Sequence, residues 1–509
     1  MATAAPPSAA AQAAMTLAAI AATAATPRPS GEALADQSTR VARGITLQLA
    51  DPSLATGGTW VLSWVGLSPD NANMAYLAVN TDGSNTFAVV IRGTDANVTD
   101  LLEDLGVGTV VPFTAVGTPP GPVSVAKGAM EAFTEVVTMT SAGVTLVQAL
   151  TTALRQAPSN PTVHVIGHSL GGAIATMVAP YLRTFTWPDG TPQFSLYTFA
   201  APTAGGTDFA TYVNSLKWQA NERYYNAYDL VPQAWNNLDE ARTWYPDPPG
   251  PAANEDVKAV IGAIAGLPGP NVYAQPGDDM RLNGTYGPPG SYDPSVVKKS
   301  VQDFMGQVAF QHANSTYLRL LYAPDVDAGP VVTGVSPSTG APGTQVVISV
   351  TGSGFDQYTG VDFGTVPCSQ VAIAVLPTGI RISTPAPQGV GVVPVRVTTG
   401  LGTSPAVPFG QFAYGGPAPV VVTGIGPDTG ESGTSVTITG VNFGSTATVH
   451  FGDKASKHVK VSPPDTIVAT APEQGIGVGL GKTKTVNVTV LSNGYSSPAG
   501  PSNEFVYEK

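Results

Sequence analysis

Hydrophobic and polar positions divide the chain into two regions with different periods. Residues 31–325 alternate between helix-like stretches and short apolar runs that are typical of buried strands. The helix-like stretches are Glu32–Leu49, Gly128–Arg155, Gly171–Thr184 and, within a Pro- and Gly-rich insertion, Glu255–Leu267. The strand-like runs are Trp60–Trp64, Phe87–Ile91, Val163–Ile166, Leu196–Phe199 and Tyr224–Ala227. This alternation predicts an α/β fold with a mainly parallel sheet covered on both faces.

From about residue 329 the period becomes two residues, and the helical pattern disappears. This region is a repeat, because Val332–Gly340 matches Val422–Gly430 at an offset of 422 − 332 = 90 residues. A unit of that size is typical of a small β-sandwich. We therefore expect two immunoglobulin-like all-β sandwiches, at 329–415 and 416–509, after an α/β domain at 31–328.

Residues 1–30 are rich in Ala, Thr and Pro. The first basic residue is Arg28, which follows the mildly apolar stretch Met15–Ala25, whereas a secretory signal carries its positive charge in front. We expect a disordered leader or a degenerate signal, and an added tail is equally compatible. No run approaches the ~18 apolar residues of a transmembrane helix.

The most specific local pattern is Val163–Gly172. An apolar run delivers Ser169, flanked by glycines at G-x-S-x-G spacing, and Ala173–Val178 then continues as helix. This is the arrangement of a nucleophile elbow, which exposes a serine hydroxyl near the N–H groups of a helix N-terminus. The alternative is a tight turn in which Ser169 only caps the helix.

A serine nucleophile needs a base, and the chain has five histidines. His312 is the best candidate because it lies downstream of Ser169 in the α/β region. The other histidines lie in the strand before the elbow, within the elbow, or in the β-rich region (His164, His168, His450 and His458).

The base in turn needs an acid that orients it. Asp229 follows the β-prone run Arg223–Ala227 and stands between Ser169 and His312, the chain order of α/β-hydrolases. Its competitors lie on a helix surface or in Pro-rich irregular sequence (Asp208, Asp239 and Asp247).

Together these residues resemble the class 3 lipase family, the fungal-lipase-like α/β-hydrolases, over roughly residues 40–325. The resemblance rests on Gly167–Gly172, Phe199–Thr203, Asn226-x-x-Asp229-x-Val231-Pro232, and His312 before Tyr317-Leu318. It implies hydrolysis of carboxylic esters, typically acylglycerols, with no metal or organic cofactor. Ser169 would be the nucleophile, His312 the general base, and Asp229 the residue that holds the imidazole tautomer.

The same resemblance implies an oxyanion hole. The strand Phe87–Ile91 ends in Arg92-Gly93-Thr94, and the backbone N–H groups of Thr94 and Leu170 would bind the oxyanion. An ordinary turn at the end of the strand is the alternative for Thr94.

The stretch after Thr94 has apolar residues at i, i+3, i+4 and i+7, which are Val98, Leu101, Leu102 and Leu105. This spacing predicts a short one-sided helix. In the resembled lipases a lid over the acyl pocket lies here, and a surface helix packed on the core fits the spacing equally well. The family often places a tryptophan in this region, and this chain has none between Trp64 and Trp187.

The composition of the chain limits its possible partners and its cysteine chemistry. The net charge of −12 argues against a nucleic-acid partner. A single cysteine, Cys368, excludes an internal disulfide and a cysteine-based metal cluster, and it carries no information about the compartment. We predict a secreted or cell-surface protein, with a cytoplasmic location left open.

The β-rich repeats resemble IPT/TIG domains, which would associate with a surface, a polymer or a second copy. The leading hypothesis is therefore a serine carboxylic ester hydrolase, acting on a lipid or another ester, with two appended sandwiches. One alternative is an adhesion or polymer-binding protein whose hydrolase domain is inert. Another is an acyltransferase, polyesterase or thioesterase with the same triad, because the pocket and water access decide among these reactions.

Overall fold

The computed structural model divides the chain into two compact units, with the break between Ala328 and Gly329. The residues that the structure describes are 7–24, 34–69, 72–93, 105–114, 121–157, 160–244, 255–284, 301–326, 329–341, 344–355, 358–368, 372–376, 379–385, 391–399, 402–404, 406, 410–462, 465–474, 484–497 and 503–507.

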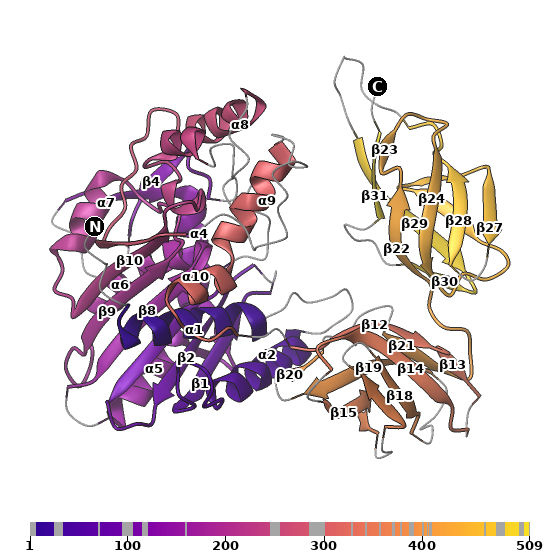
Figure 1. Ribbon diagram of the computed structural model, residues 1–509, viewed down its shortest axis with the longest axis horizontal. Coiled ribbons are helices and arrows are strands. Elements are labelled where there is room, and N and C mark those ends of the chain that lie inside the picture. The colour runs from indigo at the N-terminus through magenta and orange to yellow at the C-terminus, as the bar shows by residue number, and fades with distance from the viewer. Residues whose placement is uncertain are drawn as a thin grey trace. The chain divides into compact units, whose positions relative to one another are not determined.

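The first unit is built on a seven-stranded sheet (Figure 1). In spatial order its strands are β1 (Trp60–Leu67), β2 (Met74–Asn80), β3 (Thr86–Ile91), β8 (Thr162–His168), β9 (Gln193–Phe199), β10 (Ala220–Asn226) and β11 (Asp278–Leu282). Strands β1 to β3 are antiparallel, and every pairing from β3 to β11 is parallel. The predicted α/β fold with a mainly parallel sheet is confirmed.

Helices cover both faces of this sheet. One face carries α4 (Lys127–Thr138), α5 (Leu146–Arg155), α6 (Leu170–Thr184) and α7 (Thr207–Ser215), and the other carries α1 (Ala9–Ala24), α2 (Leu34–Leu49) and α10 (Asn314–Leu320). Successive residues of a strand point to opposite faces, so Val165 of β8 lies in one core and Ile166 in the other. This double burial explains why the central strands β3 and β8 consist mainly of apolar residues.

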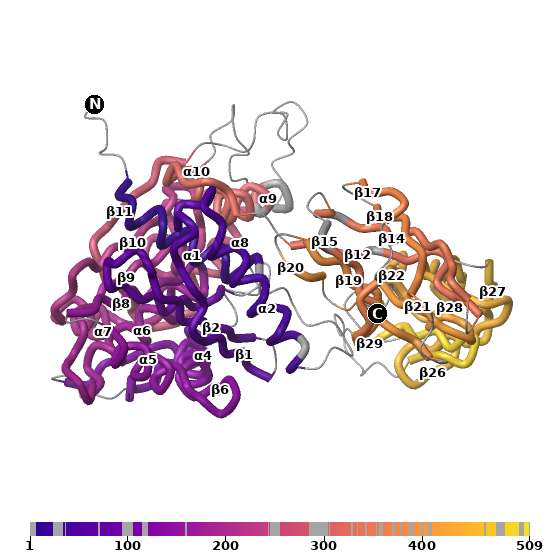
Figure 2. The backbone as a smooth tube through the Cα atoms, turned by 90° about the horizontal axis from the view of Figure 1, so that it is seen from below, coloured from indigo at the N-terminus to yellow at the C-terminus, as the bar shows by residue number. Residues whose placement is uncertain are grey.

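Helix α1 corrects the expectation of a disordered leader. Residues 9–24 form a 16-residue helix that packs against α2, α10 and β8, and Figure 2 shows it within the first unit. Met15 and Ile20 are completely buried, and the hydroxyl of Tyr76 donates to the carbonyl of Leu17 at 2.8 Å. The segment was misread because its apolar residues face nearly all directions, which leaves no one-sided stripe to recognise.

The predicted helix Gly128–Arg155 is also wrong, because the chain turns in its middle. A small hairpin separates α4 from α5, with strands β6 (Thr140–Ser141) and β7 (Val144–Thr145). Ala142 and Gly143 adopt the left-handed φ values of 48° and 79° that such a turn needs. Thr145 then starts α5 through a capping box with Gln148.

Smaller elements complete the first unit. These are β4 (Val110–Pro112), β5 (Ser124–Ala126), the 3₁₀ turns η1 (Val231–Gln233) and η2 (Leu238–Thr243), α8 (Glu255–Gly266) and α9 (Val301–His312). The helix expected at Glu255–Leu267 is confirmed as α8. Residues of η1, η2, α8 and α9 share a separate apolar cluster, which we call the cap cluster (Leu230, Val231, Ala234, Leu238, Ala241, Trp244, Val257, Ile261, Ile264, Phe304 and Val308).

The second unit consists of two sandwiches with the same strand order. In the first, one sheet is β12 (Val331–Ser336), β14 (Val347–Ser353), β18 (Gly379–Ser383) and β17 (Ala374–Leu376). The other is β13 (Thr339–Gly340), β21 (Gln411–Tyr414), β19 (Gly391–Thr399), β15 (Tyr358–Phe363) and β16 (Val366–Pro367), with β20 (Gly402–Thr403) on β19.

The second sandwich repeats this order. One sheet is β22 (Val421–Gly426), β24 (Ser435–Val441), β28 (Thr466–Thr470) and β27 (Val459–Ser462). The other is β23 (Thr429–Gly430), β31 (Glu504–Tyr507), β29 (Lys484–Ser492), β25 (Thr448–Phe451) and β26 (Lys454–Ala455), with β30 (Tyr495–Ser496) on β29. The repeat seen in the sequence is therefore a repeat of structure.

Packing explains the repeated glycines. Gly352 lies against the Val331 carbonyl and the ring of Phe355, where an added Cβ would collide. In the second sandwich Gly440 has the equivalent neighbours, which are the carbonyl of Val421 and the ring of Phe443. The G-x-x-F spacing thus records a close approach between two strands and an aromatic ring.

No helix in the described part of the chain is long and apolar enough to cross a membrane.

Candidate active site

The serine stands on a strained turn between β8 and α6. Ser169 has φ 58° and ψ −133°, a backbone conformation that is uncommon outside glycine and that is concentrated at functional sites. The turn is possible because side chains are absent around it. A Cβ on Gly167 would collide with the carbonyl of Gly171, and one on Gly171 with the carbonyl of Ile91.

The structure brings Ser169, His312 and Asp229 together, although 143 and 83 residues of sequence separate the hydrogen-bonded pairs. His312 Nε2 lies 2.8 Å from Ser169 Oγ, and His312 Nδ1 lies 2.9 Å from Asp229 Oδ2. Asp229 is fully buried, and the side chain of His312 is 13% exposed. A serine, an imidazole and a carboxylate in this order can activate the hydroxyl as a nucleophile.

The carboxylate of Asp229 has two further donors. The hydroxyl of Tyr317 donates to Oδ2 at 2.8 Å, and the backbone N–H of Val231 donates to Oδ1 at 3.0 Å. Burial, and then the charge of Asp229, raises the pKa of Tyr317 well above its usual value, so this hydroxyl stays protonated. Three hydrogen bonds, counting the one to His312, thus fix the position of a buried charge.

Asn226 connects the loop that carries Asp229 to the helix that carries His312. Its side-chain amide donates to the carbonyl of Gln311 at 3.1 Å and to Gln311 Oε1 at 2.6 Å. Its backbone N–H donates to the hydroxyl of Tyr317 at 2.9 Å. The sequence pattern contained Asn226 and Tyr317 without assigning them roles, because the contacts that define those roles are tertiary.

His168, the residue before Ser169, packs beside the site. Its ring centre lies 5.0 Å from that of His312 and 5.4 Å from that of Tyr317. Burial, and to a smaller extent the neighbouring His312, holds the pKa of His168 well below its usual range. His168 is therefore neutral and does not oppose a positive charge on His312.

The expected oxyanion and lid residues are only partly within the described residues. Leu170 is the first residue of α6, where a backbone N–H has no intrahelical partner. Thr94 lies outside the described residues, as do three of the four lid positions (Val98, Leu101 and Leu102). Leu105 is 1% exposed and packs in the core beneath α4, where its carbonyl accepts from the N–H of Gly128.

The competing acids and histidines lie elsewhere. Asp208 is exposed in the first turn of α7, Asp239 pairs with Arg242, and Asp247 lies outside the described residues. The remaining three histidines are on β8 before the elbow or in the second sandwich (His164, His450 and His458).

Two side chains join the active-site region to the cap cluster. Leu170 and Trp235 both pack partly against the main core and partly against the cap cluster. Trp235 has the left-handed φ of 62°, and its indole N–H donates to the carbonyl of Ile264 at 3.2 Å. The cap cluster thus adjoins Leu170, the residue that follows Ser169.

Among the described residues, no group of three or more histidine, cysteine, aspartate or glutamate side chains is placed to hold a metal ion.

The fold and this arrangement define an α/β-hydrolase with a serine, a histidine and an aspartate in hydrogen-bonding order. Residues 88–238 match the family model of class 3 lipases, and residues 330–410 and 419–507 each match the IPT/TIG domain. The chain therefore contains a class 3 lipase region followed by two IPT/TIG domains, as the sequence patterns predicted.

The individual proteins that are similar to parts of this chain include lipases. The secreted mono- and diacylglycerol lipase 1 of Fusarium solani is 44% identical over 77 residues, which are 15% of this chain and 21% of that protein. The match thus spans about a fifth of that relative's length. Similar solved structures include M37 lipase, with 19% identity, a TM-score of 0.49 and coverage of 61% of this chain and 91% of that one. A triacylglyceride lipase of Rhizomucor miehei gives 20% identity, a TM-score of 0.37, and coverage of 61% and 96%.

Proposed function

We propose that this protein is a serine carboxylic ester hydrolase that acts on acylglycerols or related neutral esters. The observation that carries the proposal is the continuous hydrogen-bonded series from Ser169 Oγ through His312 to Asp229. The match to the class 3 lipase model and the partial identity to a mono- and diacylglycerol lipase support the substrate class. The word "secreted" in that relative's name supports a secreted location.

In the proposed reaction Ser169 Oγ attacks the ester carbonyl while His312 Nε2 takes its proton. Asp229 holds the imidazole with Nδ1–H toward its carboxylate and stabilises the imidazolium that forms. The N–H of Leu170, at the N-terminus of α6, and the N–H of Thr94 would bind the developing oxyanion. His312 then protonates the leaving alcohol, and water releases the acyl group by the reverse sequence.

The test is Ser169→Ala in the purified full-length protein with medium-chain p-nitrophenyl esters. The substitution removes the nucleophile, so we expect kcat to fall by about a millionfold. Turnover near that of the unaltered protein would reject the proposal. Emulsified mono-, di- and triacylglycerols, compared at equal ester concentration, would then identify the preferred alcohol.

A further inference from the structure

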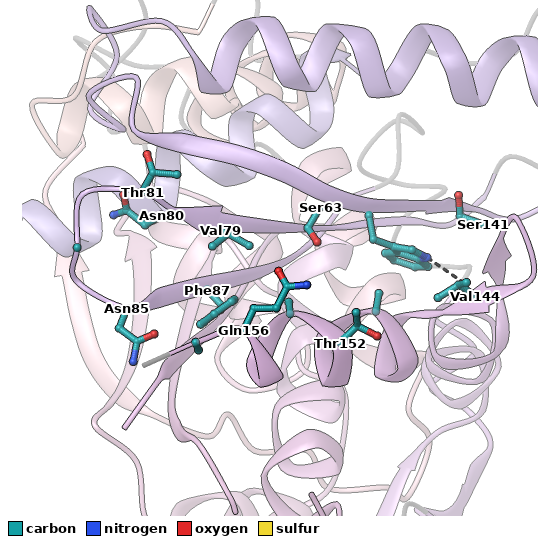
Figure 3. A pocket seen from close by; sticks show the side chains of 15 residues that line it. Ser63, Val79, Asn80, Thr81, Asn85, Phe87, Ser141, Val144, Thr152 and Gln156 are labelled. Carbon is teal, nitrogen blue, oxygen red and sulfur yellow. Dashed lines mark hydrogen bonds between the residues drawn. The ribbon is translucent and has the colours of Figure 1, made fainter. Parts of the chain in front are cut away.

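A cavity of about 740 Å³ opens on the face of the sheet that carries α5 (Figure 3). Pockets that bind small molecules have volumes of roughly 300–1,000 Å³. Phe87 lines this cavity at the beginning of β3, where it is paired with Val163 of β8. Ser169 follows the other end of β8, six residues or about 20 Å along the strand. The cavity, which we call the α5 groove, is therefore separate from the serine site.

The floor of the α5 groove is apolar and rigid. Trp64, Val79 and Phe87 line it from the sheet, and α5 contributes alanine side chains. The indole N–H of Trp64 donates to the carbonyl of Val144 at 2.9 Å, across one end of the groove. The ring also lies against Gly66, where an added Cβ would come to 2.5 Å from it. Trp64 is thus held in place before any ligand arrives.

The rim of the groove is polar but uncharged. Asn80, Asn85, Ser141, Ser63 and Gln156 place amides and hydroxyls around the opening, and none of the fifteen lining residues carries a charge. Figure 3 shows Gln156 reaching from the end of α5 toward Ser63 and Val79 of the strands. Within the described part of the chain, the side chains of Ser63 and Gln156 make no hydrogen bond, so both are available to a ligand.

We propose that the α5 groove binds an uncharged amphiphile with a hydroxyl-bearing head group and a short apolar tail. The tail would lie on Trp64, Val79 and Phe87, and the head-group hydroxyls would exchange hydrogen bonds with Gln156 and Ser63. A carboxylate is disfavoured, because the lining offers no cation and the chain carries a net charge of −12. A sugar and a glycerol both present such neutral hydroxyls, and the experiment distinguishes them.

The experiment is isothermal titration calorimetry of the full-length protein carrying Ser169→Ala, which lacks the proposed nucleophile. The probes are octyl glucoside, the ether 1-O-octylglycerol, and octanoate, each below its micelle-forming concentration. We expect saturable binding of at least one neutral probe and at least tenfold weaker binding of octanoate. Preference for the glucoside identifies a sugar head, and preference for the ether a glycerol head. Absence of saturable neutral binding, or equal binding of octanoate, overturns the proposal.

A matched pair of variants assigns the binding to the groove. Thr152 of α5 lines the groove and Thr134 of α4 does not, and both are exposed threonines whose hydroxyls donate to the carbonyl four residues earlier. We expect Thr152→Trp to weaken binding at least tenfold and Thr134→Trp to leave it unchanged. Gln156→Ala, which removes one hydrogen bond without adding bulk, should weaken it about fivefold. Equal affinity in all three variants would place the probe elsewhere and refute the assignment.

Discussion

The α/β unit and the β-sandwiches bury different kinds of side chain. Next to the serine, the first unit buries a carboxylate, Asp229, together with the amides of Asn226 and Gln311, and all three side chains are inaccessible to solvent. The sandwich cores consist of valine, isoleucine, alanine and aromatic side chains. Among the described residues of the sandwiches, the buried polar side chains are hydroxyls and amides, and no charged side chain is buried.

This difference distinguishes side chains that pack a core from side chains that the proposed reaction uses. A buried charge costs several kcal/mol of solvation free energy, and hydrogen bonds only partly offset that cost. An apolar core avoids the cost, so a fold alone gives no reason to retain Asp229. The β-sandwiches, by contrast, are explained by their packing, and their cores contain no comparable group.

The largest effect on kcat is expected from removing the charge of the buried carboxylate. Asp229→Asn keeps the shape but replaces the acceptor for His312 Nδ1–H with a group that favours the wrong tautomer. We expect kcat for p-nitrophenyl esters to fall by about 10⁴-fold. The matched control is Asp208→Asn, which removes an exposed carboxylate from α7 and should leave kcat within twofold. If both variants remained fully active, Asp229 would be a structural residue.

The local part of this site could be predicted from sequence because its signals are contiguous. Val163–Gly172 contains the strand, the tight turn and the helix start, and each requires particular residue types at particular positions. The position of Asp229 followed from chain order and from the end of a strand. The fold class followed from the alternation of helix and strand patterns, and the sandwiches followed from a repeat that is visible by eye.

What sequence reasoning missed depends on tertiary contacts. Tyr317 acts through Asp229 and Asn226, which lie 88 and 91 residues away, and no local pattern records such a contact. Helix α1 lacks a polar face because it is surrounded by protein, so its alanines resembled low-complexity sequence. The interruption between α4 and α5 requires only a short turn at Ala142-Gly143, which the surrounding helical pattern concealed.

Helix α1 extends the comparison, because it makes residues 9–24 part of the core of the first unit. Ala18 of α1 is 3% exposed, whereas Ala10 of the same helix is exposed. Ala18→Asp would bury an unpaired carboxylate, and we expect the free energy of unfolding to fall by at least ~3 kcal/mol. Ala10→Asp should change it by less than about 1 kcal/mol. Chemical denaturation followed by circular dichroism measures the free energy of unfolding of each variant. If the two variants were equally stable, α1 would not contribute to the core.

A smaller effect is expected from the hydroxyl of Tyr317, which positions Asp229 without touching substrate. Tyr317→Phe removes one donor to the carboxylate and leaves the buried N–H of Asn226 without its acceptor. We expect kcat to fall about tenfold with little change in KM. Because Asp229 loses a donor that fixes its position, the imidazole of His312 is held less well for the proton transfer from Ser169.

The control for Tyr317 is Tyr322→Phe, which changes a side chain that is 78% exposed just beyond α10. It should alter neither kcat nor KM. A purely packing role for the Tyr317 hydroxyl would lower stability in Tyr317→Phe while leaving kcat of the folded protein unchanged.

The smallest expected effect comes from removing the sandwiches altogether. Ser169, His312 and Asp229, with their partners Asn226 and Tyr317, all lie in the first unit. Truncation after residue 328 should therefore leave kcat/KM for a soluble p-nitrophenyl ester within twofold of the full-length value. The same comparison on an emulsified or insoluble ester should show a loss if the IPT/TIG domains attach the enzyme to its substrate. If the truncated protein stayed folded but no longer hydrolysed the soluble ester, the sandwiches would complete the site around Ser169. The sandwiches would then contribute to the reaction as well as to the fold.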